Sequence, residues 1–343
     1  MKTKLIESKF RLAVRTAREL FSRIGCLGAV IAICSSASAQ NLFVSGSQPE
    51  KNCLRGCGDI FKFTWDAQQS VFAYGFIDPW DVAFDKAGNL FVVDYDRSGL
   101  LGDAVVYKIT PNGARTIFAS GLSYPSYLAV DKDGNVFVAD YNHGVVYEYK
   151  PTGSRATFAS GLHHPVGMAF NSLGNLFVVD NTIGMYLGRI YEYKPNGLRG
   201  IFGALDPADR PADLAFDSSG NLLMADLGGN IYRYNLPAVL LPQPRTIFGS
   251  VPSGAQSLAC DEAGNVLVVD AGGVSNTGTV QNAIYKFTPQ GARSTFASGQ
   301  ALSESFACLA FQPMAPVCCD QGYLLESAPT PRPRPTPFPR PTL

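Results

Sequence analysis

The chain has 343 residues, of which 46% are hydrophobic and 16% are charged, so it is long and apolar enough to bury a large core. Its formal net charge is zero, but residues 1–39 hold seven basic and two acidic residues, which leaves 21 basic and 26 acidic residues in the remainder. An acidic remainder with no basic stripe argues against nucleic acid as a partner. The 34 glycines and the 37 Phe and Tyr residues favour many short strands joined by tight turns.

The N-terminal segment has the three parts of a secretory signal. A charged stretch ends at Arg23, an apolar run extends from Ile24 to Cys34, and small residues follow up to Ala39. The apolar run is too short to span a bilayer as a stable anchor. We therefore expect residues 1–39 to be a signal peptide cleaved after Ala39, which makes the protein secreted or periplasmic with no membrane span. An uncleaved N-terminal anchor is the alternative.

Six cysteines follow the predicted cleavage site, in a compartment where disulfides persist. Cys53 and Cys57 are separated by three residues, and Cys318 and Cys319 are adjacent. Metal ligation is the alternative for both pairs, but no histidine lies near either of them in the sequence, so disulfides are favoured. We predict that these four cysteines latch the two ends of the mature domain and stabilise it by about 3–5 kcal/mol. Their connectivity stays open.

A block of sixteen residues recurs five times and predicts a repeated pair of strands. In each copy a short apolar strand is followed by a turn that contains Gly-Asn, and then by a second apolar strand that ends in Asp. The Asp or Asn that opens each of these turns caps it with its side chain, and Gly accepts the positive φ of a bulged hairpin. The five copies are PWDVAFDKAGNLFVVD (79–94), PSYLAVDKDGNVFVAD (125–140), PVGMAFNSLGNLFVVD (165–180), PADLAFDSSGNLLMAD (211–226) and AQSLACDEAGNVLVVD (255–270).

After each block the sequence predicts an aromatic third strand, such as VVYEYK (145–150), and a fourth strand, such as RATFAS (155–160). The Asn residues of successive Gly-Asn pairs are spaced by 46, 40, 46 and 44 residues, which is the period of a four-stranded propeller blade. The strand NLFVS (41–45) lacks a preceding partner, and CLAFQ (308–312) lacks a following one. Joined in one blade, they predict a closed, all-β, six-bladed β-propeller over residues 40–312.

These blocks, in outline PxxLAFDxxGNLFVxD, resemble NHL-repeat proteins and the senescence-marker/gluconolactonase family of six-bladed propellers. The resemblance covers residues 41–312 and is specific for the fold. It implies a divalent metal held by an acid near the N-terminus, an Asn in a Pro-Asn-Gly block and an Asp in a Pro-Asp-Gly block. The mature N-terminus lacks that acid, and the residues directly after proline are here Trp80, Ser126, Val166 and Ala212. This departure argues against a lactonase that works by the family mechanism.

Residues 313–343 form a predicted tail that contains two of the cysteines and ends in SAPTPRPRPTPFPRPTL (327–343). Alternating prolines favour an extended polyproline II conformation and prevent the segment from packing a core. We expect this tail to be disordered. Attachment to a cell envelope is the alternative.

The innermost strands of the predicted blades line a central channel. Asp81 and Asp213 belong to blades three apart, so we predict that they face each other across it, as a carboxylate pair for acid–base chemistry or as ligands of a divalent metal such as calcium. The alternative is two solvated channel carboxylates. We expect no cofactor apart from such a metal. Two residues after the block's proline the chain carries Asp81, Tyr127, Gly167 and Asp213, and by alignment the equivalent positions of the other two blades are Ser257 and Cys308.

The connections in the predicted blades form two sets on opposite faces. The turn face carries the uniform turns that join strands one and two and strands three and four, and the loop face carries the remaining connections, which vary in length. Because variable loops on a rigid scaffold are where binding sites are built, we predict the functional site on the loop face, around the channel mouth. The ligand-binding candidates are Trp80, Asp81, Tyr95, Tyr127, Tyr141, His143, His163, His164 and Asp213.

These candidates have competing interpretations. The aromatic side chains favour stacking on sugars, aromatic molecules or peptides, with packing between loops as the alternative. The histidines serve as a base or a ligand, or are plain surface residues. The aspartates that end the second strands form a ring that resembles a metal site. Because one such aspartate occurs in each block at the same position, capping of loop amides is the favoured interpretation. The five aspartates are Asp94, Asp140, Asp180, Asp226 and Asp270.

We therefore interpret the protein as an exported, monomeric binding or interaction scaffold for an unknown small molecule, sugar or peptide. The alternative is a metal-assisted hydrolase or lactonase that uses Asp81, Asp213 and a histidine. The sequence leaves open which ligand is bound and whether the protein is catalytic.

Overall fold

A computed structural model describes residues 40–47, 58–95, 104–181, 188–235, 244–270, 273–275, 278–280, 282–298 and 308–313. The predicted signal peptide, nearly all of the predicted tail and the four cysteines of the predicted latch lie outside these residues, so export and the latch remain predictions. Every regular element of the described residues is a strand. That part of the chain accordingly offers no helix suited to crossing a membrane.

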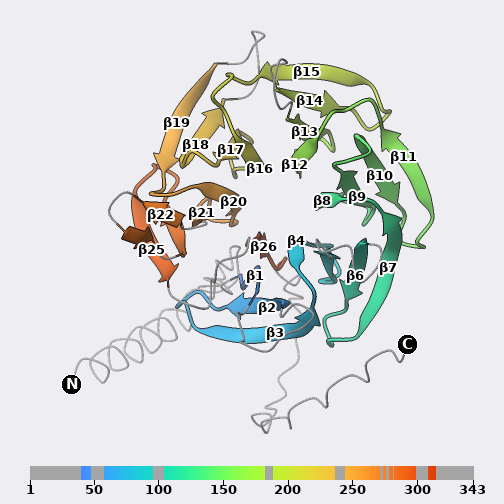
Figure 1. Cartoon of the computed structure of the whole chain (residues 1–343), viewed down its shortest axis with the longest axis horizontal. Coiled ribbons are helices and arrows are strands. Elements are labelled where there is room, and N and C mark those ends of the chain that lie inside the picture. The colour runs from blue at the N-terminus through green and yellow to red at the C-terminus, as the bar shows by residue number, and fades with distance from the viewer. Residues whose placement is uncertain are drawn as a thin grey trace, which may run out of the picture. The chain divides into compact units, whose positions relative to one another are not determined.

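Six four-stranded antiparallel sheets stand around a centre like the blades of a propeller (Figure 1). The first blade contains β26 (Leu309–Phe311), β1 (Leu42–Ser47), β2 (Gly58–Phe63) and β3 (Gln69–Phe76). The second contains β4 (Pro79–Phe84), β5 (Leu90–Asp94), β6 (Ala104–Ile109) and β7 (Arg115–Leu122), and the third contains β8 (Pro125–Val130), β9 (Val136–Asp140), β10 (Val145–Tyr149) and β11 (Arg155–Ala159).

The other three blades repeat this order. The fourth contains β12 (Pro165–Phe170), β13 (Leu176–Asp180), β14 (Arg189–Tyr193) and β15 (Arg199–Ala204). The fifth contains β16 (Pro211–Phe216), β17 (Leu222–Asp226), β18 (Asn230–Tyr234) and β19 (Arg245–Ser250). The sixth contains β20 (Ala255–Cys260), β21 (Val266–Asp270), β24 (Ala283–Phe287) and β25 (Arg293–Ser298), with a separate ribbon of β22 (Gly273–Ser275) and β23 (Gly278–Val280).

The two ends of the domain close the ring as the sequence predicts. Strand β1 pairs antiparallel with β26, with Val44 opposite Leu309, so one blade is built from both ends of the domain. Each innermost strand contacts the innermost strand of the next blade, and the circuit runs from β4 through β8, β12, β16 and β20 to β26 and back to β4. The prediction of a closed, six-bladed, all-β propeller is confirmed.

The turn chemistry read from the sequence is present in the first hairpin of each block. Asp85 accepts the backbone N–H of Asn89 on one carboxyl oxygen (2.8 Å) and the side-chain amide of Asn89 on the other (2.6 Å). Gly88 between them has a φ of +78°, which other residues rarely adopt. Asp131, Asp217 and Asp261 make the same two contacts with the Asn four residues later. This repeated turn sets the register of the two inner strands and so places the channel residues at one height.

The core lies between the blades. The second strands β5, β9, β13, β17 and β21 are buried at every position, because both of their faces are covered by neighbouring blades. Edge-to-face rings fasten one blade to the next. Phe137 contacts Phe158 of its own blade (4.9 Å) and Phe170 of the following blade (5.0 Å). Contacts of this kind add to the area that the rings bury and make the inner strands a rigid frame for a site.

Candidate functional site

The six channel positions predicted from the repeat lie on the innermost strands or directly before them, and all six are buried. Their relative exposures are small even for the polar side chains, at 6% for Asp81, 8% for Asp213 and 1% for Ser257. The two carboxyl groups are therefore not the solvated pair that the sequence left as an alternative. Tyr127, expected among exposed aromatics at the channel mouth, is also buried, with 7% exposure.

Asp81 and Asp213 are buried because each joins its blade to the next. Asp81 accepts the N–H of Val82 (2.9 Å) and, across the blade boundary, the N–H of Leu128 (2.6 Å). Asp213 repeats this arrangement three blades away, with the N–H groups of Leu214 (2.8 Å) and Leu258 (3.1 Å). Ionised carboxylates accept such bonds strongly, which compensates part of the cost of burial.

Hydroxyl groups make the corresponding links at other blade boundaries. Ser257 donates to Asp213 (2.8 Å) and accepts the N–H of Leu309 (3.2 Å), which ties the fifth, sixth and first blades together. The remaining hydroxyl links are Ser126 to the carbonyl of Pro165 (2.8 Å) and Ser45 to the carbonyl of Trp80 (3.4 Å). A hydroxyl is thus sufficient to join two inner strands.

The two carboxyl groups have different proton affinities. Burial raises the pKa of Asp81 to about 8, and the nearby carboxylate of Asp213 adds to the rise. Burial also raises the pKa of Asp213, to about 6, while bonds from Leu258, Ser257 and Leu214 to its ionised form limit the rise. Asp81 therefore has the higher proton affinity of the two, and the two carboxyl groups titrate as a coupled pair. Carboxyl pairs with separated pKa values are the usual arrangement of an acid and a base in one site.

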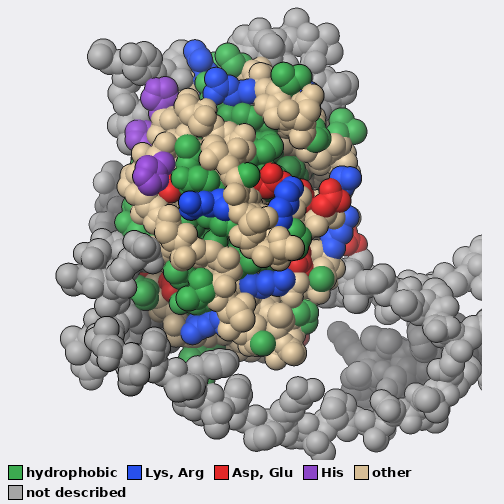
Figure 2. Space-filling view, turned by 90° about the vertical axis from the view of Figure 1, so that its right-hand side faces the viewer, with side chains coloured by type: hydrophobic (Ala, Val, Ile, Leu, Met, Phe, Trp, Pro, Cys, Tyr) green, Lys and Arg blue, Asp and Glu red, His purple; other side chains and the backbone are tan. Residues whose placement is uncertain are grey.

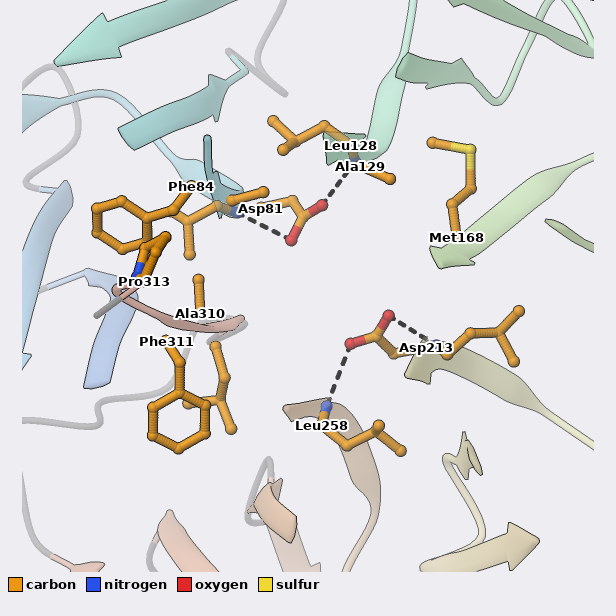
Figure 3. A pocket seen from close by; sticks show the side chains of 14 residues that line it. Asp81, Phe84, Leu128, Ala129, Met168, Asp213, Leu258, Ala310, Phe311 and Pro313 are labelled. Atoms are coloured by element: carbon orange, nitrogen blue, oxygen red, sulfur yellow. Dashed lines mark hydrogen bonds between the residues drawn. The ribbon is translucent and has the colours of Figure 1, made fainter. Parts of the chain in front are cut away.

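A cavity of about 210 Å³ connects the two carboxyl groups. In Figure 3 their side chains point toward each other from opposite sides of this space. Its walls continue along the inner strands through Ala83 and Phe84 on one side and Ala310, Phe311 and Pro313 on another. These residues lie at or just beyond the C-terminal ends of β4 and β26, and β4 leads there into the turn capped by Asp85, so the cavity extends toward the turn face. The sequence instead predicts the functional site at the loop face, which is the opposite end of the channel.

Cys308 and Tyr127 stand beside the carboxyl pair without being reactive in it. Burial and the two neighbouring carboxyl groups hold the pKa of the Cys308 thiol well above its ordinary value. Burial, then Cys308 and the two carboxyl groups, raise the pKa of the Tyr127 hydroxyl. A thiol that stays protonated is a weak nucleophile. Asp81 and Asp213 are therefore the two groups of the site whose pKa values lie near neutral pH.

The donor set does not fit the divalent metal that the family resemblance implies. At the positions after the block prolines, Ser126 already donates to a carbonyl, and Val166 and Ala212 have no ligand atom. Within the described residues no three His, Cys, Asp or Glu side chains gather around one point. Asp81 and Asp213 supply two carboxyl groups whose oxygens already accept backbone N–H groups, and calcium requires six to eight oxygens.

The remaining candidates lie on the loop face, away from the cavity. His143 contacts Asp140 (3.0 Å) and His163 contacts Asp180 (3.4 Å), both through Nδ1, while His164 donates from Nδ1 to the carbonyl of Asn181 (3.1 Å). Figure 2 shows the histidines together along one edge of the molecule. None of them belongs to the described lining of the cavity, so a histidine beside the two aspartates is not the arrangement found.

The aromatic candidates of the loop face are half-buried. Trp80 packs against the core between the second and third blades, and Tyr95 and Tyr141 each contact Tyr124, with ring centroids 4.7 and 5.5 Å apart. Tyr124 is a surface ring that the sequence did not single out. It directly precedes the proline of its block, and in four blades of the described chain the residue at this position accepts the N–H of the residue that follows the second-strand aspartate.

The second-strand aspartates cap loops, as predicted from their occurrence in every block. Asp94 accepts the N–H groups of Ile77 and Asp78 (3.0 and 2.8 Å). The other four bind the amides that precede their own block in the same way: Asp140 with Ser123 and Tyr124, Asp180 with His163 and His164, Asp226 with Arg210, and Asp270 with Ser253 and Gly254. This is a structural ring of caps, and it fixes the loop-face residues in place.

Comparison with known proteins bears on the fold. The sequence matches no protein-family model and no curated protein. A gluconolactonase from Xanthomonas campestris is similar in structure, with a TM-score of 0.51 and 16% identity, over 63% of this chain and 75% of the other. The chain is a six-bladed propeller with gluconolactonase-like structural neighbours.

Two further solved structures are similar to the propeller. A protein of unknown function from Bacteroides caccae has a TM-score of 0.57 and 17% identity, over 80% of this chain and 100% of the other. The PQQ-bound aldose sugar dehydrogenase from Streptomyces coelicolor has a TM-score of 0.52 and 12% identity, over 66% and 87%. Identities of this size show a common fold, and activity has to be argued from the site.

Proposed function

We propose that the propeller is a hydrolase of a small ester or lactone, with Asp213 as general base and Asp81 as general acid. The observation that carries this proposal is the pair of buried carboxyl groups that face one cavity with pKa values of about 6 and about 8. The gluconolactonase of the same fold makes lactones the first substrate class to test. The proposal favours catalysis over the scaffold interpretation, and it needs no metal.

The chemistry uses the two groups in turn. Ionised Asp213 takes a proton from a water molecule as the water oxygen bonds to the carbonyl carbon of the substrate. The carbon–oxygen bond of the leaving alcohol then breaks, and Asp81 gives its proton to that oxygen. The products are a carboxylic acid and an alcohol, which are one molecule when the substrate is a lactone. Exchange of one proton with solvent returns Asp213 to the ionised and Asp81 to the protonated form.

The test is a panel of small lactones and esters incubated with the purified protein, in which hydrolysis is measured by the proton that it releases. Activity is expected to rise with pH through about 6 and fall through about 8, because Asp213 has to be ionised and Asp81 protonated. Asp213→Asn is expected to lower kcat by about 10²–10⁴-fold. Ser126→Ala is the matched control, since Ser126 is a buried link between blades that does not line the cavity.

Three results would overturn the proposal. The first is hydrolysis that Asp213→Asn leaves intact, and the second is the absence of any hydrolysis across the panel. The third is loss of activity with a chelator and recovery with calcium, which would restore the metal-assisted mechanism. If Asp213→Asn does not fold, the pH profile of the unchanged protein still decides, because a profile without both limbs contradicts the assignment.

A further inference from the structure

A strip of four aromatic rings crosses three blades on the loop face, at the end of the molecule opposite the cavity. Tyr95, Tyr124, Tyr141 and His164 form it, and we call it the aromatic arc. Successive ring centroids are 4.7, 5.5 and 4.4 Å apart, and the last pair, Tyr141 and His164, is stacked. All four side chains are half-buried, so each presents part of its ring at the surface.

The arc is held by the backbone. The N–H of Tyr95 donates to the carbonyl of Asp78, and the N–H of Tyr141 donates to the carbonyl of Tyr124 (3.3 and 2.9 Å). The caps from Asp94 and Asp140 fix the same loops. A surface of preorganised rings loses little conformational entropy when a ligand binds.

Capping alone does not require rings at these positions. In the fifth blade the same backbone bond joins the N–H of Leu227 to the carbonyl of Arg210 (2.8 Å), with an aspartate cap of the same kind. The second, third and fourth blades thus carry aromatic side chains at positions of the repeat where the fifth blade does not. A surface where the side chains differ from those of the structural repeat is typical of a binding site.

We propose that the aromatic arc binds the proline-rich C-terminal segment, residues 327–343, of a second copy of this chain. Aromatic surfaces recognise proline-rich segments because the polyproline II conformation is already extended and loses little entropy on binding. The segment alternates Pro with Arg, Thr and Phe, in the order PTPRPRPTPFPRP (329–341).

Charge and stacking both favour this occupant. Residues 40–313 contain 24 acidic and 18 basic residues, whereas residues 327–343 contain three arginines and no acid. The propeller itself stacks Arg on Tyr in five blades, with the guanidinium carbon 4.0–5.1 Å from the ring centroid. Arginines of the segment can use the same contact with the tyrosines of the arc.

The path of the chain favours a second copy over the same copy. The described chain ends at Pro313, which lines the cavity that extends toward the turn face, whereas the arc lies on the loop face. The residues from Pro313 to Pro331 reach about 60 Å when fully extended. A body of this size has a radius of about 24 Å, so the way around it to the opposite face is about 75 Å. The same copy could therefore bring only the part of the segment beyond about residue 335 to the arc, whereas a second copy can present the whole segment. Binding between copies joins opposite faces and therefore extends from copy to copy, which replaces the monomer expected from the sequence.

The experiment titrates a synthetic peptide of residues 327–343 into the chain shortened to end at residue 326, with calorimetric detection. The shortened chain keeps the whole propeller, since β26 closes the ring by Phe311. Saturable binding is expected, weakened about tenfold or more by Tyr141→Ala. Tyr74→Ala is the matched control, because Tyr74 is an exposed tyrosine on the outer strand β3, and its removal should change the dissociation constant less than twofold.

Sedimentation of the full-length chain supplies the second measurement. Association that increases with concentration and disappears in the shortened chain is expected. The proposal is overturned if the peptide does not bind, if Tyr74→Ala and Tyr141→Ala weaken it equally, or if the full-length chain stays monomeric. It is also overturned if an oligosaccharide occupies the arc and the peptide does not. Ester or lactone hydrolysis is read separately, so its failure leaves this test intact.

Discussion

The inner strands β12 and β16 approach each other closely at Gly167, which provides a direct test of the channel geometry. Gly167 has a φ of +47°, and a Cβ atom placed on it would lie 2.9 Å from the Cα of Asp213 and 3.1 Å from the carbonyl oxygen of Ala212. Both contacts are with backbone, which cannot rotate away. We therefore expect Gly167→Ala to push β12 and β16 apart beside one of the two carboxyl groups.

Two terms set the size of the effect. A left-handed φ at a residue with a side chain costs about 1–2 kcal/mol. Forcing an extra methyl group into a closely packed place costs about 1–3 kcal/mol. Gly167→Ala should therefore lower the free energy of unfolding by about 2–5 kcal/mol. Gly161→Ala separates the terms, because Gly161 has a φ of +70° and nothing within 4 Å of the added atom. It should show the first term alone.

Urea unfolding of both variants measures these terms, with the slope of the transition as a check that the unfolded states are comparable. The difference between Gly167→Ala and Gly161→Ala is expected to be about 1–3 kcal/mol. Equal stability of the two variants would show that β12 and β16 do not approach as closely as the structure has them. The position of Asp213 in the candidate site would then be wrong as well.

Three further predictions concern closure, pH and the cysteines. Ser45→Ala removes the acceptor of the buried N–H of Cys308, so it should lower the free energy of unfolding, measured in urea, by about 1–3 kcal/mol. Ser126→Ala removes only a donor and should lower it less. Because the folded pKa values of Asp81 and Asp213 lie above the unfolded value of 3.8, the folded state binds more protons between about pH 4 and 8, so stability should fall as pH rises through this window. The fall should be shallower in Asp213→Asn, and an unchanged slope would contradict the raised pKa values. Mass mapping of the exported protein should find the four cysteines of the predicted latch in disulfides; four free thiols would exclude the latch.

The fold could be predicted because its determinants are local and repeated. Asp85, Gly88 and Asn89 specify one hairpin through contacts within five residues, and the same letters recur in the other blocks. At the two ends of the domain, each unpaired strand is the partner that the other one lacks. The pairing of Val44 with Leu309 confirms that the two strands lie side by side in the first blade. Turn chemistry of this kind requires no knowledge of how the blades pack.

The site could be predicted only in part, because its properties come from neighbouring blades. The register of the repeat predicts that Asp81 and Asp213 lie on facing strands. The N–H groups that their carboxyl groups accept across the blade boundaries belong to Leu128 and Leu258 of the following blades. No spacing within a block reveals such a contact. Exposure was misjudged for Tyr127 for the same reason, since its side chain lies in the closed ring and not at the mouth of the channel.

The use of carboxyl groups in the channel is itself an argument for chemistry. Each buried carboxyl group joins two inner strands, yet hydroxyl groups of Ser126 and Ser257 make comparable links without the desolvation of a charge. A structural requirement alone would favour the hydroxyl at every blade boundary. Carboxyl groups occur at two boundaries, three blades apart, where Asp81 and Asp213 face the same cavity and the burial of each raises its pKa. Burying two carboxyl groups in this way lowers the stability of the fold. A function that needs both groups together would offset this loss, and hydrolysis by an acid and a base is such a function.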